Sequence, residues 1–351
     1  MTIILRQSAI LLLFLLLLYG LALAVAVPIM SPPAETNLDT AAAARSPFMT
    51  EPKYAFLSRS RLDTGDDKAI LLGASNVLAG FRPARLQQLV PQATVHNLAI
   101  GGANMTEVRQ MVDLVLEVQS PAAQRRNLFV IGAWYGLFAD DRARWHTPDR
   151  HPGDTDLDIE RYRYGFYRRT DDGPVALLPP RWLDAGVTLI KPFLLVDRLA
   201  RDIGKALRPA RAVAAPADQV PVPGVERQAQ YLAFWQDYMG GSGRLEAAPF
   251  ATLVQTIATI RASGGRVLLV DLPLPRWHAS GSPYEASYRQ HWAGLQQQLA
   301  GTDGVAFLSL SDADRPEDFS DEVHPKPRVA EGWARRLAGV LNDAPGHLAR
   351  R

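Results

Sequence analysis

The sequence predicts an α/β fold, a three-layer α/β/α domain built on five parallel strands. Short apolar runs alternate with amphipathic stretches along the chain, and each run has the length of a buried strand. The expected strands lie at residues 68–73, 94–100, 128–133, 266–272 and 305–308. The expected helices lie at residues 82–89, 106–118, 250–262, 284–299 and 329–341, where apolar residues recur at helical spacing.

A long segment, residues 140–247, separates the third expected strand from the fourth and far exceeds an ordinary connection. We expect it to be an insertion within a domain spanning residues 65–345. It could act as a lid or substrate platform, or be a structural appendage. A helix is expected at residues 184–207, with one apolar face formed by Leu189, Phe193, Val196 and Leu199. This spacing favours a core-facing stripe, and a membrane-facing stripe is the alternative.

The N-terminus predicts a membrane segment. Residues 8–27 form an apolar run of about the length that crosses a bilayer. Arg6 precedes the run, which favours a cytoplasmic N-terminus and an exported body. We expect residues 1–30 to be an uncleaved inner-membrane anchor, or alternatively a signal segment cleaved near Ala24. Residues 31–64, rich in Pro, Ala, Ser and Thr, are expected to be a tether to a periplasmic or secreted domain.

Composition excludes some classes of function. The 351 residues carry a formal net charge of +2, and the basic residues are dispersed, so nothing indicates nucleic-acid binding. The chain has no cysteine, which excludes disulfides, thiolate metal sites and a cysteine nucleophile. The seven histidines show no metal-ligand spacing. We therefore expect neither a metal nor another cofactor.

Two distant segments could form a catalytic triad. Ser75 follows the apolar run 69–72 after Gly73 and Ala74, so its hydroxyl is expected at the C-terminal edge of a strand, where ligands bind in open α/β sheets. Asp321 and His324 are three residues apart near the C-terminus and could be placed by one loop. A serine needs a histidine to take its proton, and the histidine needs a carboxylate to orient it. Alternatively, Ser75 is a helix cap and His324 a surface residue.

These segments resemble sequence blocks of the SGNH (GDSL-like) hydrolases. Gly73-Ala74-Ser75-Asn76 is similar to the first block, residues 97–102 to the second, and Asp321-Glu322-Val323-His324-Pro325 to the last. The resemblance covers residues 69–340 with one large insertion. It implies a flavodoxin-like sheet, Ser75 as nucleophile, His324 as base and Asp321 as its partner. The nucleophile elbow of α/β-hydrolases is absent, since Val77 occupies its second glycine position.

One block departs from the family. Where the family has Gly-x-Asn-Asp, the chain has Gly132-Ala133-Trp134-Tyr135, so an asparagine that donates to the oxyanion is missing. We expect the amides of Ser75 and Gly101 to form the oxyanion hole. Asn104 could replace the missing donor or could cap a helix, and Trp134 could offer only its indole N–H.

Further residues are expected near the substrate. Trp134, Arg276 and Trp277 follow expected strands and suit contacts with a carbohydrate or an anionic group. Asp271 and His278 could form a rival catalytic pair, although the 321–324 pair fits the family position better. For Tyr284, Tyr288 and Trp292, helical spacing indicates core packing.

The resemblance and the anchor together imply a serine esterase or O-acyltransferase. Its expected substrate is an acyl, in particular acetyl, ester of an extracytoplasmic polysaccharide, and its partners are the membrane and other proteins of polysaccharide export or acetylation. A lipase or thioesterase is an alternative enzyme. The alternative outside enzymes is a catalytically weak domain that binds polysaccharide or a membrane partner.

Overall fold

Five parallel strands form the central sheet of the computed structural model, which describes residues 2–29, 62–140, 154–170, 173–206 and 217–343. The strands are β1 (Lys68–Leu72), β2 (Thr94–Asn97), β3 (Asn127–Ala133), β6 (Arg266–Asp271) and β7 (Val305–Ser309), in the order β2-β1-β3-β6-β7. This order is that of flavodoxin-like sheets. The predicted fold class is confirmed, and each strand boundary lies within three residues of the prediction.

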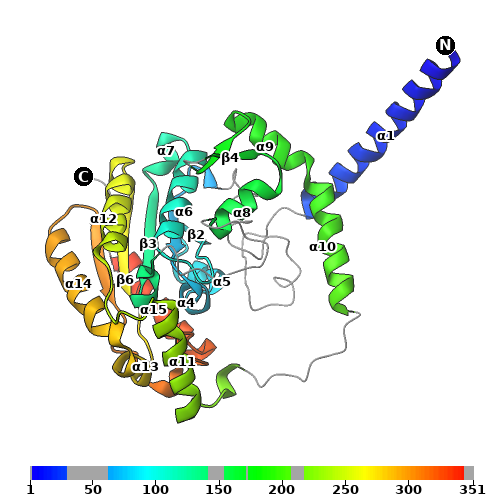
Figure 1. Cartoon of the computed structure of the whole chain (residues 1–351). Coiled ribbons are helices and arrows are strands. Elements are labelled where there is room, and N and C mark those ends of the chain that lie inside the picture. Colours follow the sequence, from blue (N-terminus) through cyan, green and yellow to red (C-terminus); the bar gives the residue numbers. More distant parts are fainter. Residues whose placement is uncertain (1, 30–61, 141–153, 171–172, 207–216, 344–351) are drawn as a thin grey trace.

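Helices cover both faces of this sheet (Figure 1). The helices that contact one another on one face are α6 (Met105–Val118), α12 (Ala247–Ala262) and α14 (Pro283–Leu299). Those on the other face are α4 (Ser75–Gly80), α5 (Pro83–Leu89) and α15 (Pro327–Asp343). Shorter elements are α7 (Pro121–Gln124), α13 (Arg276–Gly281) and the 3-10 turns η2 (Tyr135–Phe138) and η4 (Pro316–Asp318).

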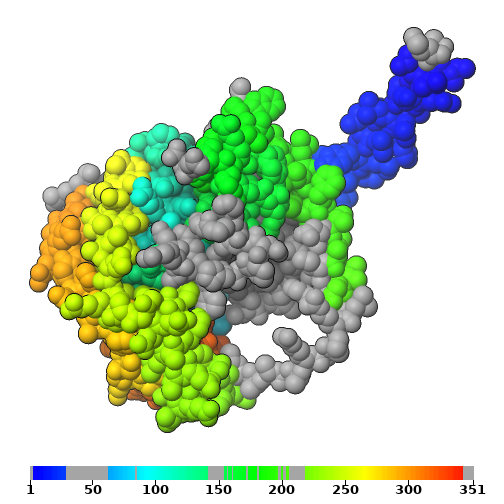
Figure 2. Space-filling model, in the orientation of Figure 1, coloured from blue at the N-terminus to red at the C-terminus, as the bar shows by residue number. Residues whose placement is uncertain are grey.

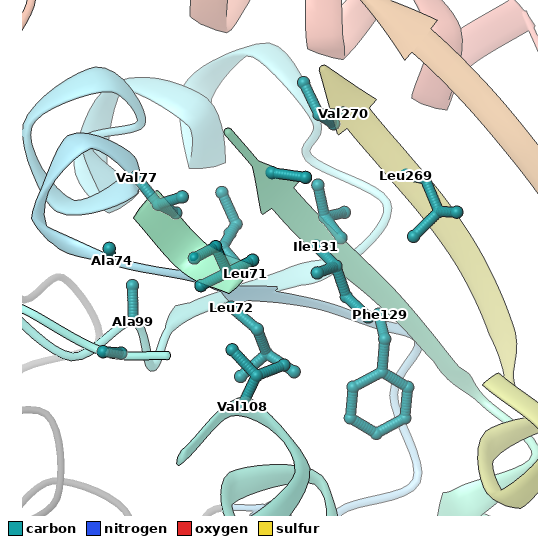
Figure 3. Close-up of a cluster of buried hydrophobic side chains, with 14 of the residues drawn as sticks. Leu71, Leu72, Ala74, Val77, Ala99, Val108, Phe129, Ile131, Leu269 and Val270 are labelled. Carbon is teal, nitrogen blue, oxygen red and sulfur yellow. The ribbon is translucent and has the colours of Figure 1, made fainter. Parts of the chain in front are cut away.

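The core lies between these two helical layers (Figure 3). Every residue of β1 and β3 is buried, as expected for parallel strands covered on both faces. Leu72 and Phe129 belong to this core, and Val108 of α6 packs into it from one face. Tyr284, Tyr288 and Trp292 on α14 are buried, which confirms their predicted packing role.

The insertion contains more structure than the sequence predicted. Its elements are α8 (Asp156–Arg163), β4 (Tyr167–Thr170), β5 (Gly173–Ala176), α9 (Pro180–Leu189), α10 (Lys191–Ala206), η3 (Ala217–Gln219) and α11 (Val225–Tyr238). The strands β4 and β5 form an antiparallel pair, and α8 contacts α6. The insertion therefore packs on the body through α8 and, as shown below, through α11.

The predicted helix at 184–207 is wrong in two respects. The structure has two helices, α9 and α10, with the break at Ile190. Pro192 explains the break, because its ring lacks an N–H and clashes with the carbonyl four residues earlier. The predicted stripe does not face the core either: Leu189, Phe193, Val196 and Leu199 are 51%, 66%, 66% and 52% exposed.

A long apolar helix, α1 (Thr2–Ile29), projects from the body (Figures 1 and 2). Residues 3–28 are long and apolar enough to cross a membrane, although a signal sequence would pass the same test. The C-terminal part of α1 contacts α10. Most of the expected tether, residues 31–64, lies outside the described residues.

Candidate active site

The serine lies where a tight turn leaves the end of β1. Ser75 is the first residue of α4, the third residue after the end of the strand, and is partly exposed. Gly73 makes this turn with φ of +141°, and a Cβ there would lie 2.8 Å from the carbonyl oxygen of Gly132. Only glycine fits this conformation and this space without strain. The serine is thereby placed at the C-terminal edge of the sheet.

A hydrogen-bond chain joins this serine to the C-terminal loop. The Oγ of Ser75 lies 2.8 Å from Nε2 of His324, and Nδ1 of His324 lies 2.7 Å from Oδ2 of Asp321. The tautomer that satisfies both contacts carries its proton on Nδ1, so that Nε2 accepts from the serine hydroxyl. The three side chains expected to act together are therefore brought together.

The loop that carries the aspartate and histidine is held by its own backbone. The amides of Val323 and His324 donate to Oδ1 of Asp321 at 3.0 and 2.8 Å. The amide of Ser320 donates to the carbonyl of His324 at 2.9 Å, which closes the loop. These bonds fix the carboxylate and leave its other oxygen for the imidazole.

The electrostatics of the pair suit a general base. Burial alone would lower the pKa of His324, but the hydrogen bond and the negative charge of Asp321 outweigh it and raise this pKa above its ordinary value. Burial alone would raise the pKa of Asp321, and the hydrogen bonds from His324 and the loop amides overcome this and lower it. The pair thus stabilises the imidazolium that forms when a proton leaves Ser75.

The predicted glycine loop lies next to the serine turn. The amide of Ile100 donates to the carbonyl of Gly73 at 2.9 Å. The Asn97 side chain ties the same loop to α4, donating to the carbonyl of Phe81 at 2.9 Å. Gly101 is exposed, with nothing within 4 Å of an added Cβ, so an anion can approach its backbone. The Ser75 amide begins a helix and has no intrahelical acceptor.

Asn104 caps helix α6, which is the second of the two roles expected for it. Its Oδ1 accepts from the amides of Thr106 and Glu107 at 3.1 and 3.3 Å, and the Glu107 carboxylate accepts from the Asn104 amide. These bonds form the capping box of α6, and Asn104 is 2% exposed. The structure gives no support to Asn104 as an oxyanion donor.

Trp134 does not lie where a substrate could touch it, which corrects its predicted role. It is 3% exposed, and its ring meets that of Trp235 on α11 edge-on at 4.8 Å. Tyr135 and His278 pack against the same two rings. The indole N–H of Trp134 has no acceptor among the described residues. Trp134 thus belongs to a buried aromatic cluster that holds the insertion to the body.

The two other predicted substrate residues lie on α13. Arg276 is exposed and forms two 3.0 Å hydrogen bonds with Asp314. The half-buried ring of Trp277 stacks on His278, with ring centroids 5.4 Å apart. The Arg276 guanidinium is exposed but paired with Asp314 through Nε and Nη2, and much of the Trp277 indole is engaged in packing.

The rival pair of Asp271 and His278 does not form. Asp271 accepts hydrogen bonds from Tyr288 at 2.9 Å and Arg289 at 2.5 Å. The Nδ1 of His278 is 2.7 Å from the backbone carbonyl of Glu322, and its Nε2 is 2.5 Å from the Tyr135 hydroxyl. Because Glu322 lies between Asp321 and His324, His278 supports the loop of the triad. Apart from the position of His278 after a strand, nothing in the sequence indicates this role.

Comparisons with known proteins add little. No protein-family model matches the chain, and no curated protein matches it. Among solved structures, a proposed acylhydrolase from Bacteroides fragilis aligns with 83% of this chain and 95% of its own length. The identity is 12% and the TM-score 0.41, so this likeness supports no argument. Among the described residues, no group of three His, Asp or Glu side chains could hold a metal.

Proposed function

We propose that the protein is a serine-dependent acyl-ester hydrolase or O-acyltransferase. The observation that carries the proposal is the unbroken hydrogen-bond chain from Asp321 through His324 to Ser75 at the sheet edge. A binding domain has no need for this arrangement, since each member serves to make the serine hydroxyl nucleophilic.

The geometry supports a two-step reaction. The Ser75 oxygen attacks the ester carbonyl while His324 takes the hydroxyl proton, and the backbone amides of Ser75 and Gly101 stabilise the oxyanion. His324 then gives the proton to the leaving alcohol, which leaves an acyl-serine. Water or a sugar hydroxyl attacks this ester next, with His324 again taking the proton. The bond between the acyl group and Ser75 Oγ then breaks, and His324 returns the proton to Ser75, so hydrolysis and transfer share one intermediate.

We propose an acetylated or acetyl-accepting polysaccharide outside the cytoplasm as the substrate. The support is the apolar helix α1, which could anchor the body to the inner membrane on its periplasmic side, together with the exposed guanidinium of Arg276. Trp277 offers part of an aromatic face for a sugar ring. Other proteins of polysaccharide export or acetylation would then be neighbours on the same membrane.

A fluorophosphonate probe tests the nucleophile on the full chain in detergent. Covalent labelling is expected for the parent chain and for Ser242→Ala, a control that removes an exposed serine in another loop. Labelling should be lost in Ser75→Ala and in His324→Ala. Labelling that persists without Ser75, or that never occurs in the folded parent chain, would refute the proposal.

One observation favours a second candidate, a polysaccharide-binding domain with little activity. The side chain expected to be the third oxyanion donor is absent, since Trp134 is buried and Asn104 caps a helix. Losing one such donor costs about 3 kcal/mol in other enzymes. An unlabelled parent chain that still binds acetylated polysaccharide would select this candidate.

A further inference from the structure

Helix α10 has an apolar face that the described structure leaves largely exposed, apart from the contact of Tyr19 on α1 with Phe193. Among the described residues outside α1, twelve large apolar side chains are exposed, and nine of them lie between residues 175 and 203. Four of the nine, Phe193, Val196, Leu199 and Ile203, form one face of α10 at helical spacing, and Leu189, the last residue of α9, comes just before them; all five are at least half exposed. Nearby on α9, the Trp182 ring is 57% exposed. We call the five residues the α10 face.

The α10 face begins at the helix that could cross the membrane. The ring of Tyr19 on α1 lies 5.9 Å from the ring of Phe193, and the Tyr19 hydroxyl donates to the carbonyl of Leu189. Further along α1, Ala26 is 1% exposed, while Leu21 and Val25 are 63% and 48% exposed. From this junction α10 runs along the outer side of the body (Figure 1).

The length of α1 sets the depth of this junction. A helix rises about 1.5 Å per residue, so a hydrocarbon layer of about 30 Å takes about 20 residues. A span that starts at Ile3 therefore reaches the far boundary near Ala22. Tyr19 lies just before this boundary, where tyrosine rings concentrate in membrane proteins. Phe193, in contact with Tyr19, must then lie at the surface of the same bilayer.

The charges of α10 fit a membrane surface as well. The sequence of the helix holds four basic residues, Lys191, Arg198, Arg201 and Lys205, against two acidic ones, Asp197 and Asp202. A helix with an apolar face and an excess of basic residues is typical of segments that lie in the headgroup region of anionic membranes. Leu194 and Leu195 of α10 are partly buried and pack against the hydrophobic core cluster.

We propose that α10 is an interfacial helix that lies on the bilayer crossed by α1, with the α10 face inserted among the lipid headgroups and upper acyl chains. The partner is an anionic lipid surface, identified by the continuity of this face with the membrane span. With α1 upright and α10 flat on the surface, the body is held in one orientation.

Depth-dependent quenching tests this contact on the full chain. Because the chain has no cysteine, Val196→Cys and Val225→Cys can each be labelled with an environment-sensitive fluorophore. Val225, 83% exposed at the start of α11, is the matched control at the end of the body away from α1. Both chains are reconstituted in phosphatidylcholine–phosphatidylglycerol vesicles with and without headgroup-proximal nitroxide lipids. Leu199→Cys provides a second site with the same expectation.

The expected result is blue-shifted emission and loss of intensity with nitroxide lipids at positions 196 and 199, and neither effect at position 225. Emission typical of water at all three positions would overturn the proposal. Equal quenching at all three would overturn it too, since the contact would not be specific to α10. Blue-shifted emission without quenching at 196 and 199 would mean that protein, such as a second copy of the chain, covers this face.

Discussion

Replacing His278 should loosen the loop of the triad without touching the triad itself. His278 is fully buried and joins two groups: its Nδ1–H donates to the carbonyl of Glu322 at 2.7 Å, and its Nε2 accepts from the Tyr135 hydroxyl at 2.5 Å. In His278→Phe the Glu322 carbonyl loses its donor, and the Tyr135 hydroxyl loses its acceptor and keeps only its contact with Ser282. In His278→Asn the side-chain amide can still donate to Glu322.

The magnitude follows from these two contacts. A buried polar group left without a partner costs about 1–3 kcal/mol, so the Phe variant should lose about 2–6 kcal/mol in free energy of unfolding. The Asn variant should lose about half as much. Since whole domains are stable by only about 5–15 kcal/mol, the first loss is large. Esterase activity should fall in the same order, because Glu322 lies between Asp321 and His324.

The pH dependence of the free energy of unfolding distinguishes a buried, neutral His278 from a side chain that only fills space. Burial lowers its pKa from 6.5 to about 4, against weaker opposing effects of the Glu322 carbonyl and the Asp321 charge. The unfolded chain therefore binds more protons than the folded one between these values. The contribution of neutral His278 is complete above pH 6.5 and is lost as pH falls towards 4, by about 3 kcal/mol. The cost of His278→Phe should shrink by this amount over that window.

Unfolding monitored by circular dichroism, on the full chain in detergent at several pH values, measures both effects, and hydrolysis of a small acetyl ester measures the activity. The reasoning fails if the Phe variant is as stable as the parent near pH 7. It fails equally if the cost of the Phe substitution is the same at pH 4.5 and pH 7, since His278 would then not be held neutral by burial.

Three further predictions follow from the same geometry. Asp321→Asn should lower activity by about 10⁴-fold. It should also move the acid limb of the pH–rate profile to lower pH, because the variant lacks the carboxylate that raises the pKa of His324. An acid limb that stays at the same pH would contradict this reasoning. Gly73→Ala should lower the free energy of unfolding, measured by thermal unfolding, by at least about 1–3 kcal/mol, because Gly73 has a positive φ. Gly339→Ala on α15, where an added Cβ meets no atom within 4 Å, should raise it by up to about 1 kcal/mol. Removing residues 1–30 should leave a folded body by circular dichroism, because only the C-terminal part of α1 touches it; an unfolded product would place α1 in the core.

Much of the sheet was predictable because strand position depends on local signals. The apolar run before Ser75 and those at 128–133 and 266–272 are continuous, as two-sided burial requires, and each became a strand. The triad could be predicted because the requirement for serine, histidine and carboxylate is chemical, and the spacing of Asp321 and His324 lets one loop place both.

The rest depended on contacts between distant segments. The sequence does not predict the insertion helix α11, since the burial of Trp235 depends on rings that lie far away in the sequence, above all Trp134, about a hundred residues earlier. Helical spacing cannot say where the apolar face of α10 points, because this spacing is the same for a core-facing and a lipid-facing stripe. The sequence shows only the side-chain type of His278, which suits a catalytic base, while its actual partners are Tyr135 and the carbonyl of Glu322.

Two residues that follow β3, Trp134 and Tyr135, account for both the placement of the insertion and the role of His278. Where the resembled family has two polar side chains, this chain has Trp134 and Tyr135, and both point into structure rather than into the site. Trp134 packs on Trp235 of the insertion, and the Tyr135 hydroxyl, whose ionisation burial suppresses by raising its pKa, bonds His278 and through it the loop of His324. In our proposed mechanism this chain uses the end of β3 to hold its histidine loop and its insertion in place, and leaves oxyanion binding to the backbone amides of Ser75 and Gly101.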